Sequence, residues 1–238
     1  MTVSGGQSNW GNPSLAPSDR SNWQNCSQDG LIEAVSRVSS NFGLAVVFAV
    51  LGFLFFFRLG AYYLWDDEAA QSLFAEQVWR TGDTSAVVGQ NIIAYNQGAE
   101  LSLLHGRANP PLPAYVIAPF VGLGGRSPFW VRFPGALCGL AYCGLILFWL
   151  RRAGADLTTS VLFCLGLLGD VALILFSRQA RYYGIVLLCS LAIGYLYLAR
   201  PRTARTLVGI SLLQFCLLAS HTMTYAGVAA VLEHFRFR

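Results

Sequence analysis

A series of long apolar runs constrains this chain of 238 residues more than any other feature. A helix needs about 20 apolar residues to cross the hydrocarbon core of a bilayer, and the run Phe42–Ala61 has that length. Apolar residues make up 55% of the chain and charged residues only 12%, whereas a soluble domain usually has about 25% charged residues. The sequence therefore predicts an all-α integral membrane protein with about five to six transmembrane helices.

The predicted spans after the first are joined by short loops, so neighbouring helices should form antiparallel hairpins. These spans are Phe129–Leu150, Leu157–Phe176, Tyr183–Ala199 and Leu207–Ser220, with a sixth beginning near Ala226. Residues 1–40 are polar and rich in Ser, Asn, Gln and Gly. This composition predicts a flexible tail in front of a membrane domain over residues 41–238.

Residues 62–127 form the longest loop between predicted spans, and we expect two helices in it that lie along the membrane surface. The first begins with acids and runs about four turns to Arg80, with Glu68 and Glu76 opposite its apolar arc. That arc holds Ala70, Leu73, Phe74 and Val78. The second, Pro113–Gly125, would be only about 20 Å long, too short for a hydrocarbon core of roughly 30 Å.

The charged residues and cysteines exclude several classes of protein. All 16 cationic side chains are arginine, and a P-loop requires lysine. The net charge of +4 is small and dispersed, which does not suggest binding to nucleic acid. Five of the six cysteines lie in apolar runs and none forms a Cys-x-x-Cys pair, a pattern typical of small buried side chains.

Arginine placement predicts the orientation in the membrane. If the tail is cytoplasmic and Pro113–Gly125 does not cross, the arginines at the short loops between the later spans and at the end of the chain face the cytoplasm, as the positive-inside rule for short loops requires. These are Arg151, Arg152, Arg200, Arg202, Arg205, Arg236 and Arg238. A reversed tail with a crossing Pro113–Gly125 satisfies the rule equally well. The short length of this segment and its internal Pro119 favour the first model, in which residues 62–127 are extracytoplasmic.

Three consecutive acids, Asp66, Asp67 and Glu68, follow the first predicted span in a chain with only 12 acidic residues. Acids are common in the first turn of a helix, where the helix dipole favours the ionised carboxylate. An ionised carboxylate just outside the headgroups is also suited to accept a proton from a hydroxyl group. The spacing leaves two interpretations open, a solvated helix start and a catalytic base.

Two later loops on the same predicted face carry further candidates. Arg178, Arg181 and Tyr182 follow the third span, where arginines run against the positive-inside bias. A guanidinium binds phosphate oxygens with its planar fork, although interfacial arginines and tyrosines produce the same pattern. His221 follows the fifth span, either as an interfacial hydrogen-bonding residue or as a binding group. No metal-ligand set is evident in the sequence, so a divalent metal stays an open question.

The acids after the first span are followed by the arginine loop after the third span and the histidine loop after the fifth. With this order of segments, the chain resembles the multi-spanning C-type glycosyltransferases, in the branch of the dolichyl-phosphate-mannose–protein mannosyltransferases and their bacterial relatives. The similarity extends from about Phe42 to Tyr225. It is carried by Trp65–Glu68 with the helix through Glu76, Gly82-Asp83, Pro110–Leu112 with the helix to Gly125, Val131–Pro134, Ala180–Tyr183 and Ser220-His221.

The resemblance implies a catalytic site on the extracytoplasmic face of a bacterial inner (plasma) membrane. The base would be the Asp of an Asp-Glu pair, which maps onto Asp67; the additional Asp66 leaves this assignment uncertain by one residue. The donor would be a sugar on polyprenyl phosphate, transferred with inversion to a lipid, glycan or protein acceptor. Arg178 or Arg181 would hold the phosphate, with Tyr182 and His221 nearby. Some members of the family bind a divalent metal.

Members of that family are typically much longer, so we expect this chain to be a truncated or N-terminal portion that needs further spans or a partner. Two other hypotheses stay open. The chain could be half of a transporter, for which Asp170 is the only acid inside a later span. It could also be a non-catalytic membrane scaffold, in which the acids are dispensable.

Overall fold

The computed structural model describes residues 42–87 and 105–236, so the tail expected over residues 1–40 lies outside the described part. The chain divides into two units, Met1–Gly43 and Leu44–Arg238, and the account below concerns the second. The described residues are mostly helical, as the sequence predicts, and form nine helices and a two-stranded sheet. After the helix Phe42–Phe56 come α2 (Asp66–Thr81), β1 (Ser85–Val87), β2 (His105–Arg107), α3 (Leu112–Gly124), α4 (Pro128–Arg152), α5 (Leu157–Gly169), α6 (Val171–Ser177), α7 (Tyr183–Ala199), α8 (Ala204–Ser220) and α9 (Thr222–Arg236).

Among the described residues, α4 alone is long and apolar enough to cross a membrane as a single helix. A second crossing arises if α5 and α6 count as one bent span. The helix Phe42–Phe56, α3, α7 and α8 are apolar but shorter. The helical character of the predicted spans is therefore confirmed, while five to six membrane crossings stay a prediction.

Most predicted helices appear close to their expected bounds. Tyr183–Ala199 is α7, and the two helices expected in the long loop are α2 and α3. The last predicted span corresponds to α9, which begins at Thr222, four residues before Ala226. Only His221 separates α9 from α8. The strands β1 and β2 were not predicted; they pair antiparallel, with Ser85 opposite Arg107.

The span predicted over Leu157–Phe176 is wrong as a single straight helix, because the chain bends by 54° between α5 and α6. Asp170 occupies the break and caps α6: its side-chain Oδ1 accepts a hydrogen bond from the Leu173 N–H at 2.8 Å. A short acidic side chain at this position satisfies a helix-start N–H that would otherwise lack a partner. The break is therefore a capped helix start inside an apolar run.

The first predicted span also ends earlier than expected, at Phe56 rather than Ala61. Turns follow, and Arg58 adopts φ 53°, in the left-handed region that non-glycine residues seldom occupy. The chain then returns toward α4, where Leu59 is buried in the core.

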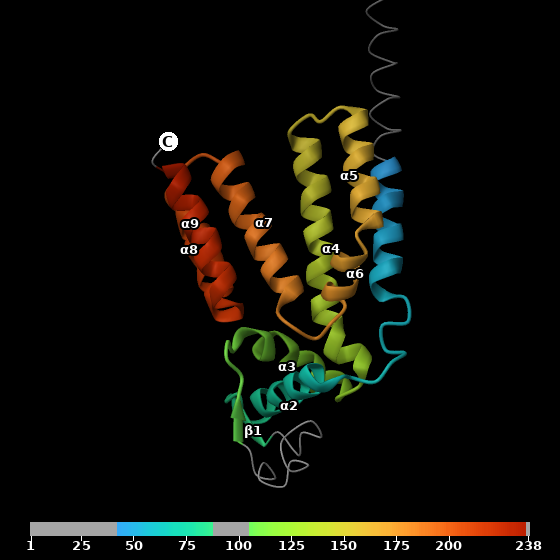
Figure 1. Cartoon of the computed structure of the whole chain (residues 1–238), viewed down its shortest axis with the longest axis vertical. Coiled ribbons are helices and arrows are strands. Elements are labelled where there is room, and N and C mark those ends of the chain that lie inside the picture. Colours follow the sequence, from blue (N-terminus) through green and yellow to red (C-terminus); the bar gives the residue numbers. More distant parts are fainter. Residues whose placement is uncertain (1–41, 88–104, 237–238) are drawn as a thin grey trace, which may run out of the picture. The chain divides into compact units, whose positions relative to one another are not determined.

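The helices α2 and α3 pack on each other and run across one end of the longer helices (Figure 1). The turns joining α4 to α5 and α7 to α8 lie at the opposite end of these helices (Figure 1). A small apolar core fixes α2 and α3 to α4 and to the segment that follows α6. Its members are Ala75, Ile117, Ala118, Val121, Val131 and Ala180.

The face of α2 that contacts the rest of the protein differs from the predicted apolar arc. Glu68, Ser72 and Ala75 are buried, whereas Leu73 and Phe74 are only half-buried. The expectation that Glu68 lies opposite the buried face is wrong. The physical reason is a partner far along the chain, Arg132, which neutralises the carboxylate where it enters the core.

Glycines of α4 allow the segment after α6 to approach closely. A Cβ atom on Gly139 would lie 2.5 Å from Ser177 Cβ and 2.6 Å from Phe55 Cε1. A Cβ on Gly135 would lie 2.7 Å from the Gln179 carbonyl oxygen. None of these distances is possible for a real Cβ atom, so the lack of side chains at Gly135 and Gly139 allows the segment that leads to Arg181 to lie close to α4.

Candidate functional site

Glu68 is the one buried acid in the described part of the chain, with 1% of the residue exposed. Its carboxylate receives two hydrogen bonds from Arg132, from Nη2 to Oε2 at 2.6 Å and from Nε to Oε1 at 2.9 Å. The Ala180 N–H donates to Oε1 at 2.9 Å. Glu68 thus joins the start of α2 to α4 and to the loop before α7.

Arg132 extends this connection to the turns after the first described helix. Its guanidinium donates to the carbonyl oxygens of Leu59, Tyr62 and Tyr63 at 3.0–3.2 Å. Arg132 was not among the predicted site residues. The signal was present, however: an arginine within the first turns of an apolar helix needs a partner, and three acids precede it in the chain.

Asp67, the neighbour of Glu68, makes a more open ion pair with Arg181, at 3.1 Å between Oδ2 and Nη1. The Asp67 side chain is 52% exposed and that of Arg181 26% exposed. The Arg181 guanidinium also lies over the rings of Tyr182 and Tyr183, at 5.6 and 5.4 Å from their centroids. The two consecutive acids therefore differ in accessibility. Glu68 is buried and its partner Arg132 is largely buried, whereas Asp67 and its partner Arg181 are partly exposed.

Tyr182 links Arg181 to His221. The two rings stack with centroids 4.3 Å apart and planes inclined by 17°. Burial, followed by the neighbouring Tyr183 phenol, raises the pKa of Tyr182, so its hydroxyl keeps its proton at neutral pH. The structure thus brings together four predicted site residues, Asp67, Arg181, Tyr182 and His221, from three separate segments.

His221 is held in one orientation by the start of α9. Its Nδ1 lies 2.8 Å from Thr224 Oγ1 and accepts a hydrogen bond from the Thr224 N–H at 3.3 Å. Because a backbone N–H can only donate, Nδ1 is the acceptor, and the neutral ring carries its proton on Nε2. The Nε2–H group is therefore a donor that no described residue engages.

The two other predicted residues lie apart from this cluster. Asp66 is exposed, and its side chain makes no hydrogen bond or ion pair with the described residues. Arg178 donates from Nη2 to the Phe57 carbonyl oxygen at 2.7 Å and lines a pocket. Burial, and then the charge of Arg132, lower the pKa of Arg178.

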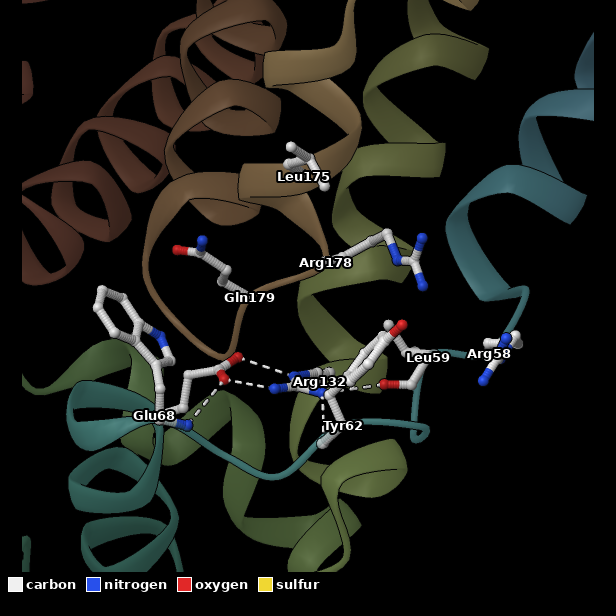
Figure 2. Close-up of a pocket in the computed structure, with 9 residues that line it drawn as sticks. Arg58, Leu59, Tyr62, Glu68, Arg132, Leu175, Arg178 and Gln179 are labelled. Atoms are coloured by element: carbon white, nitrogen blue, oxygen red, sulfur yellow. Dashed lines mark hydrogen bonds and ion pairs between the residues drawn. The ribbon is translucent and has the colours of Figure 1, made fainter.

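That pocket has a volume of about 440 Å³ and opens between the turns after the first described helix and the end of α6 (Figure 2). The paired Glu68 and Arg132 line it, together with Arg178 and Gln179 from the segment after α6. Its complete lining is Arg58, Leu59, Tyr62, Trp65, Glu68, Arg132, Leu175, Arg178 and Gln179.

The described residues bring no three His, Cys, Asp or Glu side chains close enough to hold a metal ion. Comparison with protein-family models, curated proteins and solved structures found no match for this chain.

Proposed function

We propose that this chain is the catalytic membrane part of an inverting glycosyltransferase that moves a sugar from polyprenyl phosphate to an extracytoplasmic acceptor. One observation carries the proposal. Asp67, Arg181, Tyr182 and His221 come from the start of α2, the loop before α7 and the junction of α8 with α9, yet they form one contiguous cluster. This cluster joins the segments on which the resemblance to C-type glycosyltransferases rests.

Exposed apolar side chains support the membrane location. The described residues expose many large apolar groups along the outer faces of their helices, more than single scattered side chains would explain. Examples are Phe53, Leu162, Phe163, Leu165, Leu212 and Phe215. The turns after α4, which ends in Arg151 and Arg152, and after α7, which is followed by Arg200 and Arg202, lie at the end opposite α2 and α3 (Figure 1). The short loops at that end fit the positive-inside rule if that end faces the cytoplasm, and the acid cluster is then outside.

The chemistry requires a base, a leaving group and a counter-charge. Asp67 would take the proton of the acceptor hydroxyl as that oxygen bonds to the anomeric carbon. The bond between this carbon and the phosphate oxygen breaks on the opposite face, and the phosphate departs with the electron pair. Arg181 would stabilise the charge on the departing phosphate. Attack from the face opposite the leaving group inverts the anomeric carbon.

The ion pair between Asp67 and Arg181 suits this division of roles. It is a single contact between partly exposed side chains, so an arriving phosphate can compete for the guanidinium. Once Arg181 turns toward the phosphate, Asp67 is free to accept a proton. Glu68, with both oxygens engaged by Arg132 and Ala180, positions the start of α2 instead.

Labelling of single cysteines tests the proposed orientation, in a variant that lacks the native cysteines. Cysteines placed at Ser85 and at Ala153 should react with an impermeant reagent from opposite sides of the membrane. The experiment uses spheroplasts and inverted vesicles. Labelling of both positions from the outside would contradict the orientation.

Consumption of a labelled donor tests the proposed activity. Membrane vesicles that carry the protein should release radiolabelled sugar from a polyprenyl-phosphate hexose or pentose more rapidly than vesicles without it. The product should have the opposite anomeric configuration to the donor. If the whole protein consumes none of several polyprenyl-phosphate sugars faster than the background rate, the proposal that it is a glycosyltransferase is contradicted.

The broken helix pair α5–α6 favours a second candidate function, half of a transporter. Discontinuous helices with polar residues at the break line substrate sites in several transporters, and Asp170 stands at this break. Its carboxylate already caps α6, which makes it a less available ligand. Uptake of a labelled solute by proteoliposomes, abolished by Asp170→Asn, would favour the transporter.

A further inference from the structure

The pocket beside the ion pair of Glu68 and Arg132 has an excess of positive charge. Three arginines line it, Arg58, Arg132 and Arg178, and only one carboxylate, that of Glu68 (Figure 2). Arg132 takes up this carboxylate with two hydrogen bonds. Arg58 and Arg178 therefore have no acidic partner within the described residues.

The effect of the crowded charges is visible on Arg178. Its pKa is lowered by burial and, next, by the positive charge of Arg132. A neighbouring anion would relieve both effects, since it would neutralise the crowded cations and replace the lost hydration with hydrogen bonds. Arg178 uses only one N–H group on the Phe57 carbonyl oxygen, so others of its five donors remain for a ligand.

Arg58 reaches the pocket from an uncommon backbone conformation. Its φ of 53° lies in the left-handed region, where bulky residues are rare. The residue is exposed, and its side chain makes no ion pair or hydrogen bond with other described residues, although its carbonyl oxygen accepts a hydrogen bond from the Ala61 N–H. Such a conformation persists where the surrounding structure holds it, and it often accompanies a binding site.

The remaining walls of the pocket are apolar or aromatic. They are formed by Leu59, Tyr62, Trp65 and Leu175. Tyr62, Trp65 and Leu175 each expose more than half of their surface, at 71%, 52% and 55%. A small inorganic anion would leave these apolar walls exposed to solvent, whereas a ligand with an apolar chain would cover them.

We propose that this pocket binds a phosphate-bearing amphiphile, with its phosphate between Arg58 and Arg178 and its apolar chain against Trp65 and Leu175. The phosphate is recognised because two unpaired guanidinium groups offer planar forks of N–H donors. The site contains neither Asp67 nor Arg181, so it goes beyond the proposed transfer site. Its occupant is a membrane phospholipid, which holds the turns after the first helix in place.

Binding of phosphatidic acid to the purified full chain in neutral detergent tests this site. Dioleoyl phosphatidic acid should bind, as measured by native mass spectrometry, at least about tenfold more tightly than dioleoylglycerol, which lacks the phosphate. Arg58→Gln and Arg178→Gln should each weaken binding by a similar factor. Arg205→Gln is the matched control, since Arg205 is exposed on α8 outside the pocket, and it should change nothing.

Two results would overturn the proposal. One is equal affinity for phosphatidic acid in the wild type and in Arg58→Gln, a variant that loses no side-chain hydrogen bond or ion pair to another described residue and should fold normally. The other is competition by inorganic phosphate at the concentration at which the lipid binds, which would show that the apolar walls contribute nothing. Because the probe carries no sugar, this result is independent of whether sugar transfer occurs.

Discussion

Glu68 and Arg132 form a two-point ion pair in the protein core, although 64 residues separate them in the sequence. The adjacent residue, Asp67, pairs with Arg181 at the surface through a single contact. Because the buried Glu68 fixes the start of α2, it also fixes the position of the accessible Asp67 next to it. The proposed division into a positioning Glu68 and a reacting Asp67 rests on this difference.

Glu68→Gln should destabilise the protein by about 3–5 kcal/mol, because it leaves Arg132 as a largely buried cation without its counter-charge. The measurement is thermal or denaturant unfolding of the purified protein in detergent. Glu76→Gln is the matched control, since Glu76 pairs with Arg80 and Arg126 at the surface, and it should cost about 0–1 kcal/mol. Equal effects of the two substitutions would contradict an anchoring role for Glu68.

Gly139→Ala should displace the segment that positions Arg181. The new methyl group would lie 2.5 Å from Ser177 Cβ, so we expect a loss of about 1–3 kcal/mol in unfolding free energy. Sugar transfer should fall as well. Gly166→Ala serves as the control, because no atom lies within 4 Å of the position where its Cβ would be; it should preserve stability. Wild-type stability and transfer in Gly139→Ala would show that this close approach is not needed.

Arg181→Ala should weaken binding of the polyprenyl-phosphate donor more than it affects folding. Loss of a charge-assisted hydrogen bond to phosphate costs about 1.5–3 kcal/mol, or roughly 10- to 150-fold in affinity. Arg181→Lys should restore only part of this, because lysine lacks the planar fork. Arg80→Ala, which removes an exposed arginine outside the cluster, should leave the affinity unchanged. Unchanged donor affinity in Arg181→Ala would assign the phosphate to another group.

Local sequence patterns predicted the helices well but not their interruptions. The uninterrupted apolar run Tyr183–Ala199 has the same bounds as α7, because no charged residue or proline breaks the run. The break at Asp170 was not predicted, since the apolar residues Val171–Phe176 continue the hydropathy of the span on its far side. A single acid inside an apolar run is also a possible helix cap, and the prediction did not use this.

The candidate site was only partly accessible to sequence reasoning. The acid cluster, Arg181 and His221 were identified as separate signals, each with an ordinary interfacial interpretation. Their contacts depend on long-range packing: the hydrogen bond from Ala180 to Glu68 alone spans 112 residues. For the same reason, local spacing could not show that Glu68 is buried or that it is the acid that pairs with Arg132.

The rate of sugar transfer by Asp67→Asn tests the central claim most directly. The amide keeps the shape of the side chain but cannot accept a proton, so the rate should fall by about 10²- to 10⁴-fold, while the lipid donor still binds. Asp66→Asn is the control and should be far milder, since Asp66 lies outside the cluster. The assay follows radiolabelled sugar from polyprenyl phosphate to acceptor in membrane vesicles that carry the protein. Full activity in the Asp66→Asn, Asp67→Asn double variant would contradict the account and leave the acids as a solvated helix start.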